Sequence, residues 1–301
     1  MAFERPFVRG GVVEGFPQPA PALADAEKAF IAERWADAQA AYKLALEQCP
    51  TCYTAMAGWA DCELRRSGGD LPGALGWYER ALELNPYDAQ LHVFRASALF
   101  RMGRVPEAQR ELVEALVLRP RYGFALKLAL AARQARSLPM EIDAVPLLPT
   151  GYLKSAGGDK LTFVKTSGGN AIDDLPWIFY AACKRIGPNK EYAANPTPRH
   201  PWDRSVETGC LKSLAARYKE QNAALSEAEK ARNLRVERQG SAGLDRLVRA
   251  VDAGYLDEFV TYEIQARMEP SVTLILPIAT RQRIQGYVER FVLGLRPVGP
   301  R

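Results

Sequence analysis

The chain has 301 residues, of which 48% are hydrophobic and 25% are charged, and its formal net charge is +5. This composition excludes an intrinsically disordered chain and predicts about two folded domains. Because no run of about 18 uncharged apolar residues is present, we expect no transmembrane helix.

The N-terminal segment, residues 1–19, is rich in proline and glycine and carries charges at Glu4, Arg5, Arg9 and Glu14. It lacks the unbroken apolar core of a signal peptide, so we interpret it as an arm and expect a cytoplasmic protein. Five cysteines are an odd and sparse number for a chain of this length, which argues against a secreted disulfide framework. We therefore expect reduced thiols.

Three segments that follow the arm align on prolines 36 and then 34 residues apart, at Pro50, Pro86 and Pro120. In each segment a small residue is followed by a large one, then by alanine, then by the proline. These positions are Ala38, Tyr42 and Ala45, then Ala74, Tyr78 and Ala81, then Ala108, Leu112 and Ala115. Each segment also follows another helical stretch, so the pattern predicts helix pairs with alanine at the close crossing and proline ending the second helix.

These three units resemble tetratricopeptide repeats. The resemblance covers about residues 20–136 and implies an all-α fold, a right-handed superhelix of three helix pairs. The stretch Tyr122 to Ser137 begins like a fourth first helix but has no partner segment, and we interpret it as the helix that closes the array. We expect the array to occupy residues 20–137.

The resemblance also implies a concave face lined by the first helix of each pair, where such proteins hold a peptide or a partner helix. The predicted binding residues are Glu27, Ile31, Asp61, Arg65, Gln90, Val93, Phe94, Ser97, Arg101, Lys127 and Gln134, with Phe30, Ala57, Leu64 and Ala131 beside them. The three basic residues form one wall, and the two acidic residues lie opposite. This face suits a segment with apolar anchors and an acidic group, although part of it could instead pack against the chain's own arm or C-terminal domain.

One subset of the family grips the terminal carboxylate of heat-shock chaperones with a Lys/Asn/Asn/Lys/Arg set. The corresponding positions here are Leu23, Glu27, Gly58, Gln90 and Phe94, and none of them matches. We therefore do not expect that class of partner.

The second half changes character at residue 138. Residues 138–175 have prolines, Gly-Gly pairs and short apolar runs, which indicates an irregular linker with a hairpin around Leu161 to Lys165. Residues 176–301 show helical periodicity and predict a helical C-terminal domain, in which Ser226 and Glu229 fit a capping box that opens a charged helix. Residues 1–150 carry a net charge of −1 and the remainder +6, an excess too modest to favour a nucleic-acid partner.

Motifs for catalysis, metals and cofactors are sparse. His92 and His200 are the only histidines, and His92 falls at a packing position of the third repeat. Gly168-Gly169-Asn170 is not followed by the Lys-Ser/Thr of a phosphate loop, and neither a dinucleotide fingerprint nor a zinc quartet occurs. We expect no catalytic residue, no metal and no cofactor.

Cys49-Pro50-Thr51-Cys52 has the spacing of a redox or zinc site. In the repeat register, however, Pro50 is a helix-ending proline, and both cysteines fall at variable positions of a turn. With Cys62 on the following helix, a partial metal site or a reversible disulfide is the alternative interpretation.

Two functional hypotheses follow. The first is a non-enzymatic protein-interaction module that acts as an adaptor, a scaffold or a dedicated chaperone for a protein or peptide partner, with its oligomeric state left open. The second is an enzyme whose active site lies in the C-terminal domain and whose repeats recruit the substrate. That active site would draw on Asp173, Asp174, Cys183, His200, Asp203 and Cys210. The shortage of histidines favours the first hypothesis.

Overall fold

The structure, a computed structural model, describes residues 7–9, 12–14, 21–134, 151–155, 161–165, 171–186, 203–232, 242–266 and 269–295. The chain divides into two compact units. Unit 1 comprises Met1–Ile142 and Pro270–Glu289, and unit 2 comprises Asp143–Glu269 and Arg290–Arg301. Within the described residues, no helix is both long enough and apolar enough to cross a membrane.

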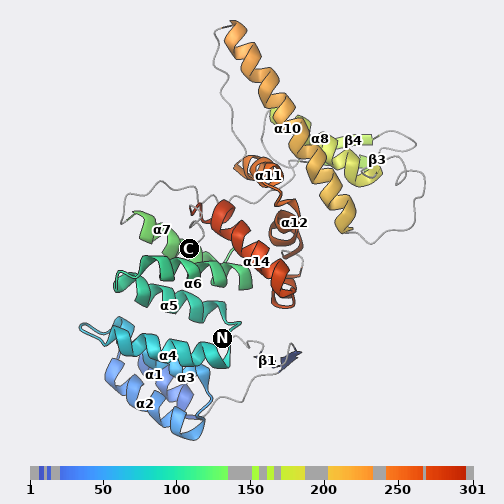
Figure 1. Cartoon of the computed structure of the whole chain (residues 1–301). Helices are drawn as coiled ribbons and strands as arrows, with labels where there is room; N and C mark the ends of the chain where they lie inside the picture. Colours follow the sequence, from blue (N-terminus) through green and yellow to red (C-terminus); the bar gives the residue numbers. More distant parts are fainter. Residues whose placement is uncertain are drawn as a thin grey trace. The chain divides into compact units, whose positions relative to one another are not determined.

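The repeat region of unit 1 is built from sequential helix pairs (Figure 1). Its helices are α1 (Pro21–Ile31), α2 (Trp35–Gln48), α3 (Tyr53–Arg65), α4 (Leu71–Leu84), α5 (Ala89–Arg101), α6 (Val105–Leu118) and α7 (Gly123–Gln134). Helix α1 packs against α2, α3 against α4 and α5 against α6, and neighbouring pairs also touch. This arrangement confirms the helical repeat fold expected from the sequence.

Small side chains and prolines explain why the pairs form. The six alanines of the repeat pattern are all fully buried, and Tyr42, Tyr78 and Leu112 are buried beside them. Alanine allows the helix backbones to approach closely, and the larger residue fills the space next to the crossing. Helices α2, α4 and α6 each end two residues before the repeat proline, where a further turn of helix would lack a hydrogen bond.

The turns inside the first and third pairs share one hydrogen-bond pattern. The Glu33 and Arg34 amides donate to carbonyls of α1, as the Gly103 and Arg104 amides donate to carbonyls of α5. The residue that closes each turn has a positive φ, 58° at Glu33 and 76° at Gly103. Only glycine adopts this conformation without steric cost, so the first turn uses a less favourable residue than the third.

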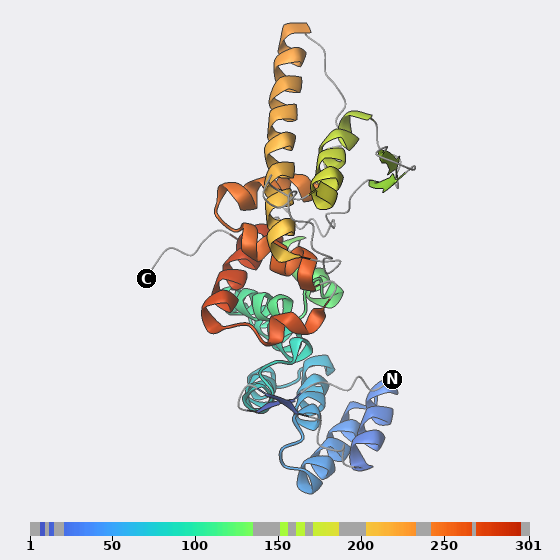
Figure 2. The ribbon, with the colours of Figure 1, turned by 90° about the vertical axis from the view of Figure 1, so that its right-hand side faces the viewer.

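A segment from far along the sequence completes unit 1. The 3₁₀ helix η2 (Pro270–Leu274) and α14 (Ile278–Tyr287) both pack against α6, and the two views show the red α14 beside the green α6 (Figures 1 and 2). The Thr273 hydroxyl donates to the Leu118 carbonyl at 3.1 Å. The expected C-terminal domain included this segment, whereas its contacts group it with the repeat array.

Unit 2 combines a hairpin with helices. Its elements are β3 (Gly151–Ser155), β4 (Leu161–Lys165), α8 (Ala171–Ile186), α10 (Arg204–Arg232), α11 (Ala242–Asp252), α12 (Leu256–Phe259) and the π-helix η1 (Val260–Gln265). Strands β3 and β4 pair antiparallel, from Gly151 opposite Lys165 to Ser155 opposite Leu161. Helix α8 packs against β3 and α10, and α10 also contacts α11, α12 and η1.

Two features of the fold depart from the sequence analysis. Helix α10 continues unbroken through Ser226, so the interpretation of Ser226 and Glu229 as the start of a new helix is wrong. The N-terminal arm contains a short antiparallel hairpin, β1 (Phe7–Arg9) with β2 (Val12–Glu14), which the sequence analysis did not anticipate. The π-helix η3 (Val288–Val292) contains the last residues of unit 1 and the first residues of the final segment of unit 2.

Candidate functional site

The predicted binding residues lie on α1, α3, α5 and α7 and differ widely in exposure. Exposed side chains are those of Glu27, Ile31, Arg65, Arg101, Lys127 and Ala131, and half-buried ones are those of Phe30, Leu64, Gln90, Phe94 and Ser97. Asp61, Val93 and Ala57 are buried, and the side chain of Gln134 lies outside the described residues. The accessible members of the set are therefore mainly basic and apolar.

Two of the basic residues are brought together at the C-terminal end of α3. The Arg65 guanidinium lies over the Phe30 ring, 5.4 Å from its centroid. The Arg101 guanidinium, from the next first helix, donates a hydrogen bond to the Leu64 carbonyl. Positive charge at this end of a helix complements its dipole, which holds both side chains near the last turn of α3.

An aromatic cluster lies further along the same set of helices. The Phe94 ring lies 6.4 Å from the Tyr78 ring and 6.0 Å from the Phe124 ring, with the two phenylalanines edge to face. Phe124 remains 43% exposed. The sequence analysis missed Phe124, although the repeat period offered a signal, because Phe124 follows the selected Gln90 by 34 residues.

Asp61 is a buried carboxyl on this face. Its side chain is 8% exposed, and the Tyr78 hydroxyl donates a hydrogen bond to it. Burial raises the pKa of Asp61 from 3.8 to about 7, although the Tyr78 hydrogen bond and the charge of Arg65 act in the opposite direction. Burial, followed by the Asp61 charge, raises the pKa of Tyr78 well above its usual value. The carboxyl therefore changes charge near neutral pH.

The packing around Gly58 explains why this chain lacks one residue of the carboxylate-gripping set. A Cβ atom placed on Gly58 would lie 2.2 Å from the Tyr42 ring, so no side chain fits without displacing that ring. An asparagine there, as in the chaperone-binding subset, would clash with a buried repeat residue. The absence of the motif at this position thus has a packing reason.

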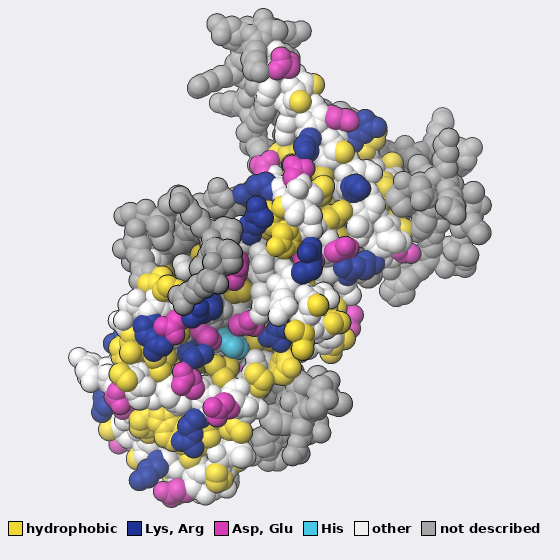
Figure 3. All heavy atoms as spheres, in the orientation of Figure 1, with side chains coloured by type: hydrophobic (Ala, Val, Ile, Leu, Met, Phe, Trp, Pro, Cys, Tyr) yellow, Lys and Arg dark blue, Asp and Glu magenta, His cyan; other side chains and the backbone are white. Residues whose placement is uncertain are grey.

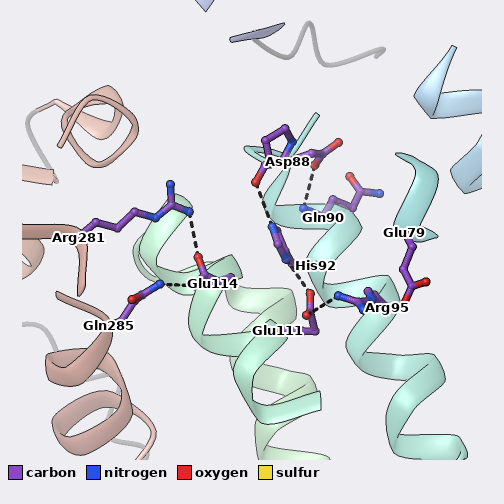
Figure 4. A network of polar contacts seen from close by, with 10 residues as sticks. Glu79, Asp88, Gln90, His92, Arg95, Glu111, Glu114, Arg281 and Gln285 are labelled. Atoms are coloured by element: carbon purple, nitrogen blue, oxygen red, sulfur yellow. Dashed lines mark hydrogen bonds and ion pairs between the residues drawn. The ribbon is translucent and has the colours of Figure 1, made fainter. Parts of the chain in front are cut away.

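His92 belongs to a polar network between the second and third pairs (Figure 4). Its Nδ1 lies 2.7 Å from Glu111 and its Nε2 lies 3.1 Å from the Pro86 carbonyl. Arg95 donates to Glu111 at 2.7 Å and to Glu79 at 2.8 Å. Both ring nitrogens therefore lie within hydrogen-bond distance of an oxygen atom. The histidine links α5 to α6 and has the packing position that the repeat register indicates.

The cysteines of the Cys-Pro-Thr-Cys stretch are free thiols in the structure. Cys52 and Cys62 are buried and Cys49 is half-buried. Burial raises the pKa of Cys62 to about 12, which opposes formation of the reactive thiolate. Within the described residues, no group of three or more His, Cys, Asp or Glu side chains is arranged to hold a metal ion.

Three of the residues considered for an active site in the C-terminal domain make structural contacts. Cys183 and Cys210 form a disulfide, so the expectation that all thiols are reduced is wrong for this pair. The Asp203 carboxylate accepts from the Ser205 amide at 2.8 Å and from the Val206 amide at 3.2 Å, which caps α10. The side chains of Asp173 and Asp174, and His200 as a whole, lie outside the described residues.

The face of unit 1 seen in Figure 3 is mixed in charge. In the view of Figure 3, basic and acidic side chains alternate over the repeat helices, with apolar side chains between them.

Comparisons with known proteins find a distant structural likeness. No family model matches the chain, and no curated protein matches it. The first TPR of Spaghetti (RPAP3) bound to the HSP90 peptide SRMEEVD is 19% identical with a TM-score of 0.36, over 38% of this chain and 90% of that chain. Yeast Tom70 is 17% identical with a TM-score of 0.30, over 90% of this chain and about half of that chain, 48%. These scores are too low to carry an argument, so the repeat assignment rests on the helix pairs themselves.

Proposed function

We propose that this chain is a protein-interaction module whose first-helix face on unit 1 binds a partner segment, and that it acts as an adaptor, a scaffold or a dedicated chaperone. The observation that supports this proposal most directly is the combination of the Arg65 and Arg101 guanidinium groups with the exposed edge of the Phe94–Phe124 pair. All four side chains come from the helices that line the binding face in the repeat family.

The chemistry of this face indicates what the partner carries. Guanidinium groups form their strongest hydrogen bonds with carboxylates, so an acidic side chain or a terminal carboxylate suits the Arg65 and Arg101 end. A partly exposed aromatic pair offers an anchor for an apolar or aromatic side chain. Lys127 is exposed one turn beyond Phe124 and adds positive charge at that end. We therefore expect a partner segment that carries both acidic groups and apolar side chains.

The proposal is tested with the full chain as bait and a paired substitution on the face. Arg65→Glu with Phe124→Ser removes one charge contact and one anchor, and both positions are exposed, so the fold should persist. Proteins that co-purify are quantified by mass spectrometry, and the dissociation constant of the recovered partner is measured by calorimetry. We expect binding at least about tenfold weaker than for the unchanged chain.

A matched control lies on the second helices. Lys43→Glu with Leu44→Ser on α2 reverses one exposed basic charge and truncates one apolar side chain of similar exposure, 48% for Leu44. This control should bind the partner as the unchanged chain does. Equal loss in both variants, or full binding by both, would place the interaction elsewhere on the molecule.

A further inference from the structure

The β3–β4 hairpin and α8 form a sub-assembly within unit 2. Among the described elements, β3 makes its extensive contacts with β4 and α8, and α8 makes its own with β3 and α10. The attachment of this sub-assembly to the helices α11, α12 and η1 therefore passes through the interface between α8 and α10.

Helices α8 and α10 pack closely, and their described polar contact lies between Tyr180 and Glu207. The Tyr180 hydroxyl donates to Glu207 at 2.5 Å, and Glu207 is 2% exposed. Arg217 lies over Phe179, 4.8 Å from the ring centroid, but the ring remains 43% exposed, where a cation–π contact contributes little. Within α8, Trp177 is buried and meets Tyr180 edge to face, and Val206, Leu211 and Leu214 are buried on α10.

The disulfide lies next to these contacts. Cys183 and Cys210 each follow the Tyr180–Glu207 pair by three residues, one helical turn further along α8 and α10. The bond joins residues 27 apart in sequence, and closing a loop of that length restricts the open state in the chain-entropy account. Reduction of the bond should therefore weaken the attachment of α8 to α10.

We propose that the Cys183–Cys210 disulfide is a redox-controlled tether, which a dithiol reductant opens to release α8 and the β3–β4 hairpin from α10. The two sulfur atoms differ in access, because Cys183 is half-buried and Cys210 is fully buried. A thiolate of the reductant attacks the Cys183 sulfur, the S–S bond breaks, and Cys210 leaves as a thiolate that takes up a proton.

The second thiol of the reductant then resolves the mixed disulfide. Cys183 is released as a thiol, and the reductant becomes a cyclic disulfide. Two electrons and two protons pass in total from the dithiol to the protein, and no other reactant is needed. A reducing compartment would favour the released state, and an oxidising one would favour the tethered state.

Hydrogen–deuterium exchange of the purified full chain tests the tether, with dithiothreitol as the probe. Alkylation under denaturing conditions first counts the free thiols, and three of the five are expected before reduction. After reduction, amide exchange in α8 and in β3–β4 should accelerate at least about tenfold, while α3 to α6 stay unchanged. Reoxidation should restore protection. Five free thiols in the air-oxidised chain, or unchanged exchange in α8 after full reduction, would overturn the proposal.

Two cysteine variants assign the effect. Replacement of the unbonded thiols, Cys49→Ala with Cys52→Ala and Cys62→Ala, should leave the response to dithiothreitol intact. Cys183→Ser with Cys210→Ser should exchange rapidly in α8 with or without the reductant. If this second variant fails to fold, the loss of protection in unit 1 reveals it, and the response of the first variant still decides the matter.

Discussion

At the scale of single residues, Asp61 has an environment that differs strongly from that of an exposed aspartate. It lies on a helix face assigned to binding, yet it is buried and receives the Tyr78 hydroxyl. The groups that interact with it come from three helices: Arg65 and Cys62 on α3, Tyr42 on α2 and Tyr78 on α4. Ionising Asp61 places a charge where water solvates it poorly, which is why its pKa rises to about 7.

This shift predicts a pH dependence of stability. The pKa of Asp61 is higher in the folded state, about 7, than its ordinary value of 3.8, so the folded state holds the proton more tightly. The stabilisation is complete below about pH 4 and is lost as the pH rises through about 7, by about 4 kcal/mol in total. Asp61→Asn keeps an acceptor for Tyr78 and cannot ionise. We expect the variant to match the unchanged chain near pH 4 and to unfold at higher urea near pH 8.

Urea unfolding at a series of pH values measures the difference between the two proteins, which cancels the titration of the other carboxyl groups. A difference that stays constant from about pH 4 to pH 8 would show that Asp61 is ionised throughout. A difference that grows toward low pH would reverse the assigned sign.

At the scale of elements, the contact between α11 and η1 in unit 2 depends on a buried ion pair. Arg246 donates to Glu263 at 3.0 Å, and the two side chains are 5% and 4% exposed. A buried pair of this kind is costly to desolvate, but it is more costly still to break, because the remaining charge then lacks its partner. The pair links α11 to the π-helix, and its loss should cost more than its formation contributes.

Arg246→Met should accordingly lower the free energy of unfolding by about 3 to 5 kcal/mol, because the Glu263 carboxylate is left buried. The double variant Arg246→Met with Glu263→Met should recover much of this loss, because apolar side chains of similar volume fill the site. Denaturant titration followed by circular dichroism measures both. If the double variant is as unstable as the single one, the pair contributes through packing and not through charge.

At the scale of the whole molecule, unit 1 combines helices that are close in sequence with a segment that is far from them in sequence. The described repeat helices of unit 1 pack in chain order, each against its sequence neighbours. Two elements reach α6 from more than 150 residues away, η2 with the Thr273–Leu118 hydrogen bond and α14 with contacts to Glu114. Arg281 donates to the Glu114 carboxylate at 2.9 Å, and the Gln285 amide also donates to it (Figure 4). Glu114 thus makes the described polar contacts between α6 and α14.

Glu114→Ala should loosen α14 selectively. Both Glu114 and Arg281 are partly shielded, with side chains 27% and 23% exposed, so we expect a loss of about 1 to 2 kcal/mol and faster amide exchange in α14. The matched control is Glu107→Ala on the same helix, because Glu107 pairs only locally with Arg104 three residues away in the described contacts. Exchange in α14 should not change in the control. Equal effects of the two variants would mean that α14 is held by its apolar face alone.

The sequence by itself determined the features that depend on local spacing. The alanines, the large residues beside them and the prolines at Pro50, Pro86 and Pro120 specify helix pairs, because close crossing and helix termination are decided within one repeat. The same register predicts which helices carry the proposed binding face, and Arg65 and Arg101 lie on two of these helices. It also explained Cys49 and Cys52 as turn positions without thiol chemistry.

Only the tertiary structure decided the contacts between distant residues. The pairing of Cys183 with Cys210, the return of Pro270–Tyr287 to α6 and the unbroken course of α10 through Ser226 follow from packing partners that no local pattern names. The burial of Asp61 could not be predicted for the same reason. The repeat register shows on which face of the helix a residue lies, but it does not show which side chains cover that residue. Spacing along the chain defines the helices, and the side chains that meet across them define the site.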